Sequence, residues 1–128
     1  MKMQEFTEML LACAEAHSDT DMVAEKKQFS DTLRGTFSDA QQQAPMIRRD
    51  AARILHIFLL QILQVPDEDW GEYKKLKDIY DCRICANAIA QVCVKQLMKP
   101  RSRYEFGIHD PFTESEAAEV LDRISTLL

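Results

Sequence analysis

The sequence predicts an all-α protein, a small helical bundle of about five helices. Two observations lead to this prediction. Apolar residues recur at helical spacing along much of the 128-residue chain, and only three glycines and four prolines are present to form tight turns. So few turn-forming residues favour long helices over a sheet of short strands. The hydrophobic fraction of 46% supplies a core, and a chain of this length normally forms one domain.

Three helices are expected in the first half of the chain. Phe6 and Leu10 mark one face of the first helix, and Phe29 and Leu33 mark one face of the second. The third helix carries a broad apolar stripe and ends before Pro66, because the residue before a proline is pushed out of helical conformation. The expected ranges are about 3–16, 22–37 and 47–64, with a polar linker at 41–44.

Two further helices are expected in the second half. In the fourth helix, Ile89 and Leu97 share an apolar stripe with three cysteines, and the helix stops before Pro100. The fifth helix starts at Thr113, because Thr113 and Glu116 fit a capping box in which each side chain accepts the other's free backbone N–H. The expected ranges are about 70–76 for a short helix or turn, 81–98 for the fourth helix and 98–111 for a loop.

An internal repeat organises the chain. Pro45–Leu55 returns in outline as Pro111–Leu121, 66 positions later. Both copies read proline, an apolar residue, a short polar stretch, an acid, two alanines and then aliphatic residues. Repetition predicts one structural unit used twice. We therefore expect a single helical domain over 1–128, made of one helix-loop-helix unit at 1–65 and a second at 76–128.

Short motifs in the second half of the chain carry a resemblance to a known family. They are Lys77-Asp78-Ile79, Ala88-Ile89-Ala90, Lys95-Gln96-Leu97-Met98, the run from Phe106 to Glu116, Ala117-Ala118 and Leu121. In this order, from about Leu76 to Leu127, the chain resembles an S-layer homology module, and Pro45–Leu55 resembles the same module in the first half. Gln96 and Glu114 stand where the family pattern has glycine and arginine.

The resemblance implies a function. Members of this family are helical modules, usually three together, that hold proteins on bacterial cell walls by binding an acidic wall polysaccharide. By this resemblance we expect a non-catalytic binding or assembly module that recognises an anion, a glycan or a protein on a rigid scaffold, without a cofactor. The partner would be a protein or a cell-wall-type polysaccharide. An intracellular adaptor or regulator that reuses the fold is the alternative, and pairing of half-modules between chains would give a homodimer.

Five residues are candidates for partner contacts. Arg48 and Arg49 open the third helix, where positive charge opposes the helix dipole, so an anion of a partner or a nearby acid is expected beside them. Arg101 and Arg103 lie near Tyr104, whose ring suits stacking on a sugar or anchoring a partner helix. For the aromatic residue, plain burial in the fold is the alternative.

The pair Cys82 and Cys85 has the spacing of a zinc-binding or redox motif. A structural zinc site needs four ligands, and no second pair with this spacing exists. The simpler expectation is that these cysteines pack in the core as small apolar residues. Metal binding and redox chemistry stay open as alternatives. Four reduced cysteines would suit a cytoplasmic protein.

The remaining features exclude several classes of function. A net charge of −5 disfavours nucleic-acid binding, and the basic clusters at 48–49, 74–77 and 99–103 are expected to be solvated faces among acids. No nucleophile motif accompanies the histidines, so no enzyme is expected. The apolar run at 54–63 is too short to span a bilayer, so no membrane insertion is expected. We expect a cytoplasmic protein if the chain is complete, and a cell-surface protein only if a signal peptide was removed.

Overall fold

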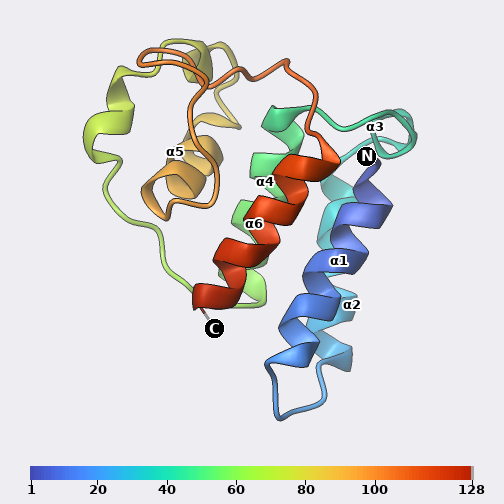
Figure 1. Ribbon diagram of the computed structural model, residues 1–128. Helices are drawn as coiled ribbons and strands as arrows, with labels where there is room; N and C mark the ends of the chain where they lie inside the picture. Colours follow the sequence, from blue (N-terminus) through green and yellow to red (C-terminus); the bar gives the residue numbers. More distant parts are fainter. Residues whose placement is uncertain (128) are drawn as a thin grey trace.

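A computed structural model describes residues 1–127. The chain is all-α, as predicted, and forms a small bundle whose long helices cross a shared core (Figure 1). Within the described residues, one isolated bridge is the only β-type pairing. The elements are α1 (Met3–Ala16), α2 (Val23–Thr36), α3 (Asp39–Gln43), α4 (Arg48–Gln61), η1 (Gly71–Lys75), η2 (Asp78–Asp81), α5 (Ala86–Val94) and α6 (Glu114–Leu127), where η denotes a 3-10 turn.

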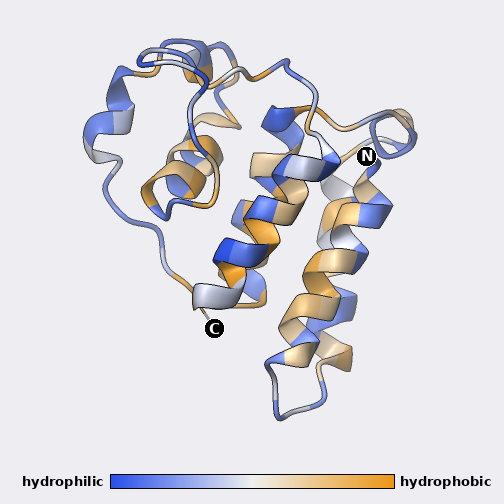
Figure 2. Ribbon diagram, viewed as in Figure 1, coloured by the Kyte–Doolittle hydropathy of each residue, from blue (hydrophilic) through white to orange (hydrophobic). Residues whose placement is uncertain are grey.

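Helix α4 is the centre of the bundle. It packs against α2 on one side and α5 on the other, and α6 packs against α1. Edge-to-face aromatic pairs join these layers, with ring centroids 5.8 Å apart for Phe29 and Phe58 and 5.0 Å apart for Phe6 and Phe112. Hydrophilic residues dominate the long segment between α4 and α5 (Figure 2). Among residues 1–127, no helix combines the length and the apolar character needed to cross a membrane.

The segments that lead into α4 and α6 pair with each other. Ile47 and Pro111 form the antiparallel bridge, the N–H of Arg48 donates to the carbonyl of Asp110 at 2.8 Å, and the N–H of Phe112 donates to the carbonyl of Met46 at 2.9 Å. The two copies of the predicted repeat begin here. Each continues into a 14-residue helix that starts three residues after its proline.

The predicted bounds of the fourth helix, 81–98, are wrong at both ends, because α5 covers only Ala86–Val94. At its start, the chain before Ala86 forms a turn that contains the two cysteines. At its end, Gln96 has a φ of 61° and the N–H of Leu97 donates to the carbonyl of Val92 at 2.8 Å. This left-handed helix stop is one that glycine usually makes, and it falls where the family pattern has glycine.

Other boundaries also differ from the prediction. Helix α4 ends at Gln61 rather than at residue 64. The short helix α3 overlaps the expected polar linker at 41–44, and a capping box of Ser38 and Gln41 starts this helix. At the start of α6, the hydroxyl of Thr113 accepts the N–H of Glu116 at 3.1 Å, as predicted. Among residues 1–127, the Glu116 carboxylate accepts no hydrogen bond from the N–H of Thr113, because this carboxylate binds two arginines instead.

Candidate functional site

Arg48 lies inside the fold. Only 3% of the residue is exposed. Its Nε donates to the carbonyl of Phe106 at 3.2 Å, its Nη1 to the carboxylate of Glu116 at 2.6 Å, and its Nη2 to the carbonyl of Lys99. The guanidinium also stacks on the Phe106 ring, 4.4 Å from the centroid. The acid that offsets the charge at the start of α4 is therefore Glu116 of this chain, and Arg48 is left out of the binding surface proposed below.

Arg101 belongs to the same ionic network. Its Nη2 donates to Glu116 at 2.7 Å and its Nε donates to Asp110 at 3.1 Å. These bonds raise the pKa of Arg101 above its ordinary value, so the side chain stays charged. The network holds the segment 99–110 against the starts of α4 and α6. Arg101 is half exposed, but both of its acids come from this chain.

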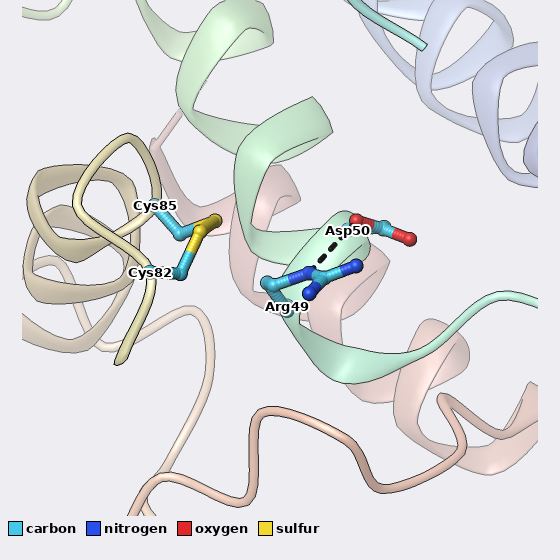
Figure 3. The surroundings of a disulfide bond; sticks show 4 residues. All are labelled: Arg49, Asp50, Cys82 and Cys85. Carbon is cyan, nitrogen blue, oxygen red and sulfur yellow. Dashed lines mark hydrogen bonds and ion pairs between the residues drawn. A yellow bond between two sulfur atoms is a disulfide. The ribbon is translucent and has the colours of Figure 1, made fainter. Parts of the chain in front are cut away.

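Arg49 has a different side-chain partner from Arg48. Its Nε lies 3.3 Å from the Asp50 carboxylate, and its side chain is about one quarter exposed. Figure 3 shows Arg49 beside the Cys82–Cys85 disulfide, with Asp50 on the far side of the guanidinium. Arg48 and Arg49 are adjacent in the sequence, but their side chains lie in different surroundings in the fold. Side chains at adjacent positions of a helix point about 100° apart.

Arg103 and Tyr104 lie at the surface. Tyr104 is 45% exposed, and its ring is flanked by Arg103 at 5.5 Å and by Lys77 at 5.4 Å from the centroid. The N–H of Lys77 also donates to the carbonyl of Tyr104 at 2.7 Å, which fixes this loop on the η2 turn. Among residues 1–127, no carboxylate lies within 4.0 Å of the Arg103 guanidinium.

A groove of about 730 Å³ opens beside Arg103. The segment 95–103, the η1 turn and the end of α6 form its walls, and we call it the cationic groove. Five basic side chains line it against a single acid, Glu72. The five are Lys75, Lys95, Lys99, Arg103 and Arg123. The sequence reveals the cluster at 99–103 but gives no sign that Arg123, 20 residues later, joins it.

Only part of this positive charge is neutralised within the described residues. Lys75 lies 3.6 Å from Glu72, and Lys95 lies 3.3 Å from Glu68. Arg123 donates to the carbonyl of Gln96 at 3.1 Å, which holds its side chain over the loop. No carboxylate of residues 1–127 lies within 4.0 Å of Lys99, Arg103 or Arg123. Three cations therefore face the groove without an acidic partner in the described chain.

Buried hydrogen bonds hold the wall that carries Lys95. The amide of Gln91, which is buried, accepts the N–H of Glu68 at 2.9 Å and donates to the carbonyl of Glu68 at 2.8 Å. The same amide oxygen accepts a bond from Lys95 Nζ at 2.9 Å. Because Gln91 is in α5 and Glu68 is in the preceding loop, the bonds fix this loop on the helix. The Lys95 side chain is thus rigidly placed, with 5% exposed.

Cys82 and Cys85 form a disulfide with their Cα atoms 5.2 Å apart. The expectation that all four cysteines are reduced is therefore wrong for this pair. Cys85 is fully buried, as expected for a core residue, and Cys82 is half-buried. Within residues 1–127, no group of three or more histidine, cysteine or acidic side chains is placed to hold a metal ion.

The other two cysteines are free thiols. Cys93 lies beneath the cationic groove, and burial raises the pKa of its thiol to about 12, although the charge of Arg48 acts in the opposite direction. A raised pKa keeps this group protonated and poorly nucleophilic at neutral pH. Cys13 is half-buried, at the end of α1, with its sulfur 3.6 Å from the Ser125 hydroxyl.

We predict that the variant Arg48→Met is destabilised by about 3 kcal/mol, because Glu116 loses a partner and two loop carbonyls lose their donor. Urea unfolding followed by circular dichroism measures this change. The matched control is Arg34→Met, which removes an exposed ion pair on α2 and should cost less than about 0.5 kcal/mol. A loss below about 1 kcal/mol for Arg48→Met would contradict the role of this network.

We also predict that iodoacetamide at pH 8 modifies Cys13 in the folded protein and leaves Cys93 unmodified. The thiolate is the nucleophile that attacks the reagent and displaces iodide, and at pH 8 a thiol with a pKa of about 12 is almost entirely protonated. Mass spectrometry of tryptic peptides measures the labelling. In urea both thiols should react. Equal labelling rates for Cys13 and Cys93 in the folded protein would show that Cys93 is not buried as described.

Comparisons of the chain with known protein families, with curated proteins and with solved structures found no match. The function is therefore argued from the chemistry of the described surfaces. The resemblance to S-layer homology modules stays a prediction from the sequence motifs.

Proposed function

We propose that the protein is a non-catalytic binding module that holds an acidic, wall-type polysaccharide in the cationic groove. One observation supports this most strongly. A chain with a net charge of −5 gathers five basic side chains around a single groove. Positive charge that is concentrated in one place on a protein with a negative net charge favours binding of an anion at that place. Carboxylate groups of a glycan would meet Lys99, Arg103 and Arg123.

The shape and surroundings of the groove fit a polymer better than a small molecule. It has a volume of about 730 Å³, and the half-exposed ring of Tyr104 lies next to Arg103, which lines the groove. Aromatic rings at the edge of a site suit the apolar faces of sugars. Of the five residues proposed from the sequence, Arg103 lines the groove and Tyr104 lies next to Arg103.

The disulfide favours a location where such a ligand occurs. Disulfides persist in oxidising surroundings such as the cell surface and are rare in the cytosol. Together with the sequence resemblance, the Cys82–Cys85 bond supports a wall-associated role over the intracellular adaptor that is the alternative. We therefore place the protein at the cell surface in this proposal, and an acidic protein segment becomes the competing ligand.

The double variant Lys99→Gln/Arg103→Gln tests the proposal. Removing two cations from the groove should weaken binding of polygalacturonate oligosaccharides about 10-fold, which corresponds to about 1.4 kcal/mol. Isothermal titration calorimetry at 50 mM salt measures the affinity. Binding should weaken further as salt rises, because exposed charges are screened.

The matched control is Lys26→Gln/Arg34→Gln, which removes the same charge from α2, far along the chain from the groove residues. It should leave the affinity unchanged. Sedimentation with purified cell walls, compared with capture of an acidic peptide such as polyglutamate, separates the two ligand classes. Tighter binding of the peptide than of the glycan, or equal weakening by both double variants, would overturn the proposal.

A further inference from the structure

The Cys82–Cys85 disulfide is not used by the groove and is poorly suited to a purely structural role. It closes a loop of only four residues. A disulfide stabilises a fold mainly by restricting the unfolded chain, and this restriction grows with the length of the loop. The shortest loops therefore gain least. The bond also joins Cys82, which is half-buried, to Cys85, which is fully buried. The two cysteines therefore differ in how accessible they are to solvent.

The position of the bond at the start of α5 favours a thiolate, although the burial of Cys85 acts in the opposite direction. Cys85 is the N-cap residue of α5, at the positive end of the helix dipole. Arg49 of α4 belongs to the surroundings of the bond (Figure 3), where its guanidinium is turned toward Asp50, whose carboxylate lies 3.3 Å from Nε and offsets part of its charge. A helix N-terminus and a neighbouring cation both lower the pKa of a cysteine, and a Cys-x-x-Cys spacing is typical of exchange-active pairs. A thiolate released at Cys85 would be stabilised by both.

Exposed apolar side chains flank the bond. Ile84, which lies between the two cysteines, is 75% exposed, and Tyr80 is 52% exposed. Neither packs in the core, although both side chains are large and hydrophobic. Ile84 and Tyr80 lie within two residues of the more accessible cysteine, Cys82, and such exposed apolar side chains suit contact with hydrophobic residues next to the cysteine of an extended peptide.

We propose that Cys82–Cys85 is a thiol–disulfide exchange site for a dithiol segment of another protein. A thiolate of the partner attacks Sγ of Cys82, a partner–Cys82 disulfide forms, the Cys82–Cys85 bond breaks, and the electron pair leaves on Cys85 beside Arg49. The partner's second thiolate then attacks the partner sulfur of the mixed disulfide, which releases Cys82 as a thiolate. The partner loses two electrons and two protons, and the cysteine pair takes up both. A low-molecular-weight disulfide returns the pair to its oxidised form.

The first experiment compares the folded protein with a short peptide that has the same sequence around the two cysteines. The full chain carries Cys13→Ser, so that only the buried Cys93 remains as a free thiol. Oxidised protein is mixed at pH 7 with a reduced peptide that holds two cysteines flanked by leucine and phenylalanine, and peptide oxidation is followed by mass spectrometry. The comparator is the oxidised synthetic peptide of residues 78–88. We expect the protein to react at least ~10-fold faster, and equal or slower reaction would overturn the proposal.

Variants then test the roles of the residues. In the reduced state, Cys85→Ser should trap the disulfide form of the peptide on Cys82, and Cys82→Ser should trap it at least ~10-fold more slowly, because Cys85 is buried. Equal trapping would contradict the assignment. Arg49→Gln should slow exchange several-fold and Arg49→Lys should restore it. The control Arg34→Gln, at an exposed arginine of α2, should leave the rate unchanged, as should the groove variant Lys99→Gln/Arg103→Gln.

Discussion

The rest of this structure depends on the pairing between the segment that precedes α4 and the segment that precedes α6. One buried arginine reinforces this pairing. The chain before α4 and the chain before α6 bridge at Ile47 and Pro111. Arg48 then reaches from the first turn of α4 to Glu116 of α6 and to two carbonyls of the long loop. A buried guanidinium is costly unless its donors are satisfied, so this arrangement permits few alternatives. It fixes two helices and the loop between α5 and α6 as one unit.

The position of the cationic groove follows from that constraint. The loop carries Lys99 and Arg103, and the carbonyl of Lys99 is itself an acceptor for Arg48. The same loop is held from the other side by Asp78, whose carboxylate accepts the N–H groups of Phe106 and Gly107 at 2.8 and 2.7 Å. A loop fixed at both ends presents its basic side chains without a large loss of entropy when a ligand binds.

The proposed groove and the proposed exchange site lie at opposite ends of α5. The groove is next to the end of the helix, where Gln96 stops it, and the disulfide is next to its start. The helix is short and packs closely on α4, so both sites rest on the same rigid pair. The two use different chemistry, because one attracts anions with surface cations and the other exposes one sulfur of a covalent pair.

The sequence by itself determined the fold class and most of the helices, because their apolar spacing is local. Its prediction for α1 agrees with the structure at both ends, and Thr113 caps α6 as expected. Where long-range contacts or turn geometry decide, the prediction was wrong. The disulfide turn shortened α5 at its start, and Gln96 took up a left-handed conformation at its end.

The binding surface depended on tertiary structure even more. Arg48 and Arg103 look alike in the sequence, since each lies within two residues of another arginine, yet one is buried among acceptors and the other lines a groove. Only the fold decides this, because burial depends on segments that lie 50 or more positions away. Arg123 joins the groove for the same reason, through helix α6. Local patterns determined which residues were candidates, and the packing of distant segments decided which of them face the groove.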